Sequence, residues 1–227
     1  MDKTTKGDPK AAVSCQVCHG VHDTGKHVLK STKRNDTHPY KGHEALDTET
    51  LVGIVQSLHH RYLELNLPLI KEIINQLDEK FQSNHKIQSP AGKTFTELKD
   101  IVEMLSHRLI AHAREEDETI FPMLLEVEKG RTDQETKKFI EEIVEAHRKE
   151  NSTMRAMLSK IKRLCSNFKL SDDPEEQTLN QLYLHLMDLE ADMAEHLKKE
   201  MELYPRIFQK LGIDDGPLRQ MLAMRVL

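Results

Sequence analysis

The sequence lacks the features that mark a membrane span, a nucleic-acid surface or a disulfide framework. Its apolar runs stay well short of the roughly 20 residues that a membrane-spanning helix needs, so we expect no span. Its 33 Lys and Arg are scattered among 38 Asp and Glu, and the net charge is −5. Because no basic stripe forms, we expect no nucleic-acid partner. Three cysteines, an odd number, describe no set of disulfides.

An export signal is also absent from the start of the chain as given. The first residues, MDKTTKGDPKAAVS, have no apolar core of the kind found in secretory signals. On this ground we expect a cytoplasmic protein. A chain of 227 residues with 37% hydrophobic content can bury one substantial core, so we predict one domain with extensions.

Glycine is scarce where the core would lie. Between Ile54 and Leu211 only Gly92 and Gly130 occur, and both fall in polar stretches that look like connections. Apolar residues recur three and four apart between these connections, which predicts long amphipathic helices. The predicted helices cover residues 48–81, 94–128, 133–168 and 174–209. Short loops favour antiparallel neighbours, so the predicted fold is all-α, an up-down four-helix bundle.

The ends of the chain differ from its middle in composition and apolar periodicity. Residues 1–47 are rich in Lys, Gly, Thr and His with little apolar periodicity, which predicts an irregular N-terminal arm. Residues 48–210 hold the bundle, in which Pro68 should kink or break the first helix. Residues 211–227 form a C-terminal extension, where LRQMLAMRVL is expected to make a short amphipathic helix that docks on the core.

Two copies of an HxxxE pattern lie in the second and fourth predicted helices. Glu116 follows His112 by four residues, and Glu200 follows His196 by four. Four residues along an α-helix place two side chains about 40° apart around the axis and one turn apart along it. A single HxxxE is usually a surface ion pair, because charged residues are usually solvated. The second copy favours a metal site instead.

The first and third predicted helices each add a candidate histidine. His60 and His147 precede the histidine of the next motif by 52 and 49 residues, which suggests a duplicated helical hairpin. Facing helices of this kind present imidazoles and carboxylates to a shared space, as in di-iron carboxylate bundles. His59 competes with His60, because the apolar stripe counted from Leu51 passes nearer His59.

Four separated stretches, in this order, carry a family resemblance. They are HHRYLELNLP at 59–68, LSHRLIAHAREEDETIFPML at 105–124, EAHRKEN at 145–151 and HLKKEMELYPRIF at 196–208. Together they resemble the hemerythrin-like (HHE cation-binding) di-iron proteins, and in particular the repair-of-iron-centres branch. The match covers about residues 50–210.

The resemblance implies a ligand set for two non-haem iron ions. The implied ligands are His60, His112, His147 and His196, with Glu116 and Glu200 as bridging carboxylates. His85 stands where the family has a further ligand histidine, and the match selects His60 over His59.

The two motifs differ in one spacing. Tyr204 comes eight residues after His196, whereas Phe121 comes nine after His112. We therefore expect a change of register at the end of the fourth helix. Other acidic residues near the motifs, Glu115, Asp117 and Glu202, are expected to be solvated neighbours, and Cys165 a buried packing residue.

The predicted N-terminal arm contains a second sequence motif. CQVCH, from Cys15 to His19, matches the CxxCH haem attachment pattern, in which Cys15 and Cys18 form thioethers and His19 is an axial ligand. The opposite axial ligand would come from His22, His27, His38 or His43. A haem of type c would place the protein in the periplasm. Two alternatives remain: a Zn or Fe site made with two histidines, or thiols without function.

The expected function is that of a non-haem di-iron protein that binds O2 or NO. Its roles would be iron-centre repair, response to nitrosative or oxidative stress, or gas sensing and storage, with a redox or iron–sulfur protein as partner. A haem on the arm would favour a redox or electron-transfer enzyme that reduces NO, O2 or peroxide at the iron pair. A third reading is a partner-binding helical protein with a vestigial site. Whether the chain is an enzyme is left open.

Overall fold

The computed structural model describes residues 13–14, 21–22, 46–84, 87–214 and 216. The chain divides into two units, Met1–Glu44 and Ala45–Leu227. In the first unit, β1 (Val13–Ser14) pairs antiparallel with β2 (Val21–His22). Cys15, Cys18 and His19 lie outside the described residues, and so does the predicted C-terminal helix.

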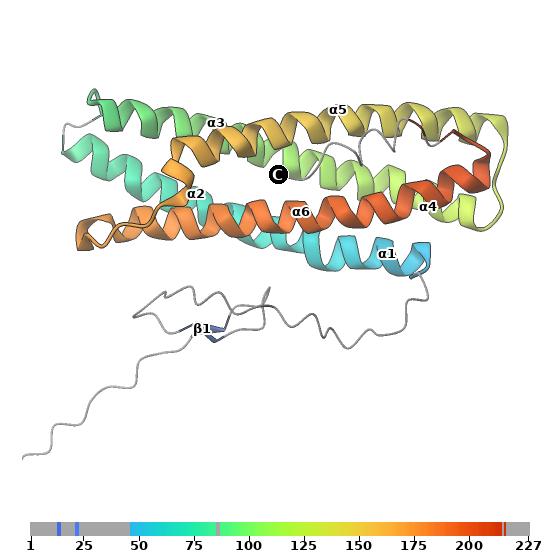
Figure 1. Cartoon of the computed structure of the whole chain (residues 1–227), viewed down its shortest axis with the longest axis horizontal. Helices are drawn as coiled ribbons and strands as arrows, with labels where there is room; N and C mark the ends of the chain where they lie inside the picture. The colour runs from blue at the N-terminus through green and yellow to red at the C-terminus, as the bar shows by residue number, and fades with distance from the viewer. Residues whose placement is uncertain (1–12, 15–20, 23–45, 85–86, 215, 217–227) are drawn as a thin grey trace, which may run out of the picture. The chain divides into compact units, whose positions relative to one another are not determined.

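In the second unit, four long helical stretches run alternately up and down beside one another (Figure 1). The first and second stretches each contain one π-helical turn. The elements are α1 (Thr48–Ile54), η1 (Val55–His60, π), α2 (Arg61–Ser83), α3 (Pro90–Glu115), η2 (Glu116–Ile120, π), α4 (Phe121–Glu128), α5 (Gln134–Leu164), η3 (Ser166–Phe168), η4 (Pro174–Glu176) and α6 (Gln177–Leu211). This confirms the predicted all-α bundle.

The helix ends follow from their capping residues. Asp47, Ser89 and Asp133 each accept a hydrogen bond from the backbone N–H three residues later, which satisfies a free donor of the first turn. Ser89 is followed by a proline that fits the first helical position, so α3 begins at residue 90 instead of the predicted 94. Gly212, at φ 61°, ends α6 in the left-handed conformation that glycine adopts without strain.

Two predictions about single residues can be checked on these helices. Pro68 lies inside α2 without ending it, so the helix is not broken there. Cys165 is fully buried, as predicted for a packing residue. Burial raises the pKa of its thiol to about 12, which keeps it in the unreactive protonated form.

The core consists of two apolar clusters with a polar layer between them. On α5, Val144 belongs to one cluster and Met154 to the other, while the buried His147 and Asn151 lie between them. The same order holds along the other helices, where the buried histidines and glutamates fall between apolar stretches. The helices therefore bring their polar residues to one level of the bundle.

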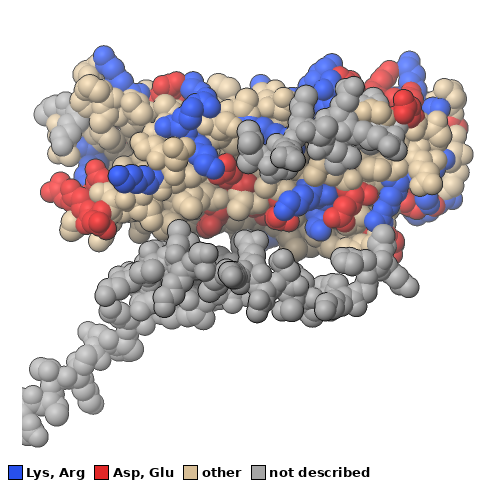
Figure 2. Space-filling view, in the orientation of Figure 1, with Lys and Arg blue, Asp and Glu red and all other residues tan. Residues whose placement is uncertain are grey.

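The surface in view is mixed in charge. Figure 2 shows Lys and Arg interspersed with Asp and Glu along the bundle. Within the part of the chain that the structure describes, no helix combines the length and the hydropathy needed to cross a membrane, as predicted.

Two neighbouring residues of α3 differ in burial, so their substitution should lower the stability of the protein by different amounts. Leu105 is 0% exposed and Met104 is 54% exposed. Leu105→Ala should lower the free energy of unfolding by about 2–5 kcal/mol, because it removes buried methyl groups and leaves a cavity. Met104→Ala should change it by less than about 0.5 kcal/mol. Denaturant unfolding followed by circular dichroism measures both, and equal costs would show that the register of α3 is wrong.

Candidate metal centre

The polar layer contains six residues that offer metal ligands. Each is at most 4% exposed; they are His60, His112, Glu116, His147, His196 and Glu200. Ionisable side chains are almost never buried to this degree unless they are paired or bind a metal. These are the residues that the family resemblance implies as ligands, apart from His85, which lies outside the described residues.

The six residues form two groups that share one carboxylate. His112, Glu116, His147 and Glu200 make one group, and His60, Glu116 and His196 make the other; within each group the ligand atoms lie within 4.8 Å of one another. Two such groups with a common member are the geometry of a two-metal site with a bridging ligand.

The two oxygens of Glu116 face different pairs of histidines. Its Oε1 lies 3.7 Å from His112 Nε2 and 3.8 Å from His147 Nδ1. Its Oε2 lies 2.9 Å from His60 Nε2 and 3.4 Å from His196 Nε2. A carboxylate in this position can donate one oxygen to each of two cations.

Glu200 completes the centre from α6. Its Oε1 lies 3.7 Å from His112 Nε2 and 3.4 Å from His196 Nε2, so it stands between one histidine of each group. Its Oε2 accepts a hydrogen bond of 3.1 Å from Asn151 Nδ2, which fixes the orientation of the carboxylate.

Unsatisfied ligand atoms show that these residues fit a metal pair. Seven buried atoms of the centre have no hydrogen-bond partner among the residues that the structure describes; they are His112 Nε2, Glu116 Oε1, His147 Nδ1 and Nε2, His196 Nδ1 and Nε2, and Glu200 Oε1. A buried polar atom without a partner costs about 1–3 kcal/mol. Cations bound between the imidazoles and carboxylates would remove most of this cost. Nitrogen and carboxylate donors together suit iron among the transition metals.

The electrostatics of the centre favour a cation between the two glutamates. Burial lowers the pKa of His196, but its contacts with Glu116 and Glu200 raise it more, to about 10. Burial raises the pKa of Glu200, but its contacts with Glu116, His112 and His196 lower it well below the usual value. His196 therefore holds a proton where a metal would carry the positive charge.

Two other histidines of the centre have opposite pKa shifts. Burial lowers the pKa of His112, but Glu200 and Glu116 raise it above the ordinary value. Burial and the neighbouring His112 lower the pKa of His147. His147 is thus ready to act as a neutral ligand.

The π turn η1 determines how His59 and His60 lie. Both are buried, at 7% and 4% exposed. A π turn inserts one extra residue, so a helical wheel fails there, and π turns are frequent at functional sites. His60 contacts Glu116, while His59 Nδ1 lies 2.8 Å from Asp192 Oδ1 on α6. The apolar stripe counted from Leu51 correctly predicted that His59 faces the core, but it wrongly placed His60 away from the core.

The second π turn, η2, explains the unequal spacing of the two motifs. It begins at Glu116 and ends at Ile120, directly before Phe121, so the first motif contains the extra residue, whereas α6 runs as one α-helix through Glu200 and Tyr204. The expected change of register at the end of the fourth helix is therefore wrong. Glu116 and Glu200 are both 0% exposed, so neither motif is displaced from the centre.

The acidic residues beside Glu116 contact the histidines from outside. Asp117 Oδ1 lies 2.9 Å from His60 Nδ1, and Glu115 Oε2 lies 3.8 Å from His147 Nε2. As expected, both are solvated neighbours, with side chains 38% and 53% exposed; their contacts with His60 and His147 were not predicted. Asp117 is placed to fix the orientation of His60, as carboxylates beside metal-binding histidines commonly do.

Sequence reasoning missed several residues of this layer. Asn151, Asp192 and Tyr204 are buried beside the centre but were not proposed for it. Each stands four residues from a predicted ligand on its own helix, namely from His147, His196 and Glu200 respectively. The four-residue spacing that found the motifs would have found these as well.

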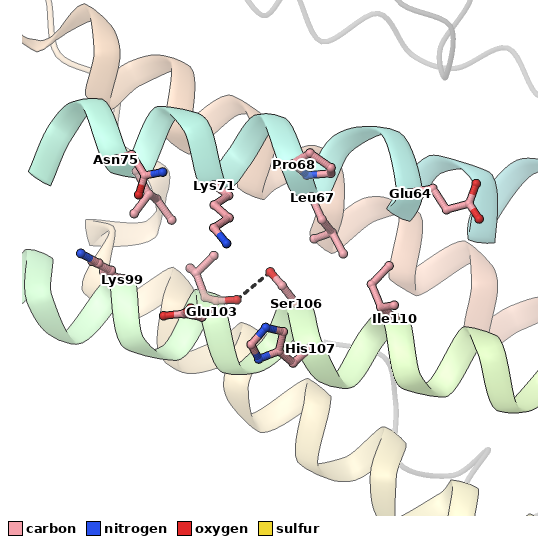
Figure 3. A pocket seen from close by; sticks show the side chains of 12 residues that line it. Glu64, Leu67, Pro68, Lys71, Asn75, Lys99, Glu103, Ser106, His107 and Ile110 are labelled. Atoms are coloured by element: carbon pink, nitrogen blue, oxygen red, sulfur yellow. Dashed lines mark hydrogen bonds between the residues drawn. The ribbon is translucent and has the colours of Figure 1, made fainter.

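A separate groove lies between α2 and α3. It encloses about 550 Å3 and shares no residue with the two ligand groups of the described chain. Figure 3 shows Pro68 and Lys71 on the α2 side and Glu103 and His107 on the α3 side. The groove is therefore not part of the metal centre.

The fold and the site define a helical bundle that holds a di-metal centre of histidines and glutamates. Comparison with known families agrees: the hemerythrin HHE cation binding domain matches residues 56–207, more than half of the chain. The protein belongs to this family. The resemblance predicted from the four sequence stretches is thereby confirmed.

Curated relatives exist at lower similarity. The iron-sulfur cluster repair protein ScdA of Staphylococcus epidermidis is 25% identical over 169 residues, which cover 74% of this chain and 68% of that protein. ScdA of Staphylococcus haemolyticus is 24% identical over 157 residues, which cover 68% of this chain and 64% of that protein. The chain is thus a distant relative of proteins named for iron–sulfur cluster repair.

The shared carboxylate predicts the effect of a near-isosteric change. Glu116→Gln should reduce bound iron from about two ions per chain to less than one, because the neutral amide lacks the negative charge that the two ligand groups share. Glu118→Gln is the matched control, since that side chain is 71% exposed on the same π turn. Metal analysis after anaerobic reconstitution measures both. Full iron content in Glu116→Gln would contradict the bridging role.

The raised pKa of His196 predicts proton release on metal binding. Its pKa of about 10 means that the metal-free protein holds this proton at neutral pH, so metal and proton compete. Affinity for Fe(II) should rise between about pH 6 and 9, by up to about tenfold per unit for each proton displaced. Anaerobic calorimetry in buffers of different ionisation enthalpy counts the protons. Binding without any proton release would argue against a protonated His196.

Proposed function

We propose that this protein binds two iron ions in a carboxylate-bridged centre and acts on O2 or NO. The observation that carries the proposal is the position of Glu116, whose two oxygens face two different pairs of histidines. On this basis His60 and His196 would hold one ion and His112 and His147 the other. Glu116 and Glu200 would bridge the pair.

Iron in this shell would supply redox chemistry toward a small gas molecule. The protein's own residues prepare the centre for it. Asp117 Oδ1, 2.9 Å from His60 Nδ1, accepts a hydrogen bond from that nitrogen and leaves Nε2 for the metal. Asn151 holds Glu200 by one oxygen and leaves the other toward the histidines. The apolar clusters on both sides exclude water from the layer.

We extend to this chain the repair role that the ScdA relatives are named for. The region shared with ScdA covers 74% of the chain, and the family match at residues 56–207 includes the whole centre. An iron–sulfur protein is then the partner, and a response to nitrosative or oxidative damage is the setting. Gas sensing and storage by the same centre remain alternatives within this proposal.

Cys15, Cys18, His19 and His85 lie outside the described residues, so the haem at the first three and the ligand role of His85 remain predictions. The division into an arm, a bundle and a C-terminal extension also remains a prediction. The cellular location is also open, and haem attachment at the arm would indicate the periplasm. Haem-specific staining after denaturation tests for the haem: a stained band supports the redox-enzyme alternative, and an unstained band excludes a covalent haem.

The repair proposal is tested with a damaged iron–sulfur enzyme. The enzyme is inactivated with NO and then incubated anaerobically with the iron-loaded protein, with a His112→Ala variant treated in the same way, or with free Fe(II). Only the iron-loaded protein should restore activity above the Fe(II) control, because the variant lacks a ligand of the shared centre. Equal recovery with the variant would contradict a repair role for this centre.

A further inference from the structure

The two halves of the bundle present matching side chains to the centre, with one chemical difference. In the first half, Glu116 is followed by Phe121 and a proline; in the second half, Glu200 is followed by Tyr204 and a proline. The extra residue of η2 accounts for the longer spacing in the first half. Phe121 and Tyr204 therefore occupy equivalent positions, and they differ by a hydroxyl group.

Phe121 shows what this position contacts. Its ring stacks on the imidazole of His60, with the ring centroids 5.8 Å apart and an interplanar angle of 8°. It is 1% exposed and belongs to the apolar cluster on one side of the polar layer. The position thus forms a wall of the metal centre.

Tyr204 occupies the corresponding position on α6, four residues after Glu200. Long side chains on a helix lean toward the preceding turn, which directs the ring of Tyr204 toward the turn that carries Glu200. The residue is 2% exposed and belongs to the same apolar cluster as Phe121. Apolar neighbours could have packed against a phenylalanine equally well.

The hydroxyl of Tyr204 has no hydrogen-bond partner within the described residues. Buried tyrosine hydroxyls usually have one, and leaving a buried donor unpaired costs about 1–3 kcal/mol. Burial raises the pKa of Tyr204 well above its ordinary value, and Glu200, Glu116 and Glu115 raise it further. A phenolic hydroxyl carries its proton at neutral pH and can donate it in a hydrogen bond.

We propose that the Tyr204 hydroxyl donates a hydrogen bond to the small molecule that binds at the metal pair. The preferred ligand would be a small anion or diatomic molecule with a terminal acceptor atom. Phe121 has no hydroxyl to donate, so the two equivalent positions differ in polarity. Tyr204 would then determine ligand specificity without holding the metal. This inference rests on the proposed di-iron function.

The test compares Tyr204→Phe with Tyr183→Phe in the iron-loaded, air-oxidised protein. Tyr183 is 9% exposed and lies in the other apolar cluster, so its variant is a matched control. Azide, a small anion with a terminal acceptor atom, is the probe, and its binding is followed by absorption. Iron content should stay unchanged in both variants. The azide dissociation constant should rise about tenfold in Tyr204→Phe alone, as expected for one lost hydrogen bond.

The metal-free proteins give a second readout. Tyr204→Phe should leave the melting temperature unchanged or raise it, because it removes an unpaired buried hydroxyl. A lower melting temperature, or loss of iron, would show a structural role and overturn the inference. Unchanged azide affinity in a fully loaded variant would overturn the inference alone. A wild-type protein that binds no iron would overturn the proposed function, and this inference with it.

Discussion

The structure depends on two carboxylates buried in the middle of the bundle. Glu116 and Glu200 are both 0% exposed and lie between two apolar clusters. A charge removed from water is stable only with compensating charge nearby. The histidines that surround the two carboxylates come from all four helical stretches. The four stretches therefore have to align at one level, where bound metal cations would supply the compensating positive charge.

Two π turns allow this alignment on the first two helical stretches. Adjacent residues point about 100° apart in a regular helix, and a π turn changes that angle locally. His59 and His60 are the last two residues of η1, and both are buried. The turn η2 begins at Glu116, where Glu115 and Asp117 on either side of it contact His147 and His60 from the outer edge. Three consecutive acidic residues thus contact the histidines of the centre, Glu116 from inside and its two neighbours from the outer edge.

Much of this could be predicted from the sequence. The scarcity of glycine and the apolar periodicity predicted the bundle, and the repeated four-residue spacing of His112 and His196 to their glutamates predicted the centre. The π turns could not be predicted, because periodicity assumes 3.6 residues per turn throughout. Partners across helices, such as His59 with Asp192, could not be predicted either, because they depend on how the helices pack. These local departures from regular helix decide which side chains reach the centre.

The central claim is that one carboxylate joins two metal ions. Anomalous diffraction at the iron edge, from crystals of the anaerobically loaded protein, tests it most directly. The account predicts two peaks, one beside each oxygen of Glu116, toward the His112 and His147 side and toward the His60 and His196 side. A single peak, or peaks that do not contact Glu116, would contradict it.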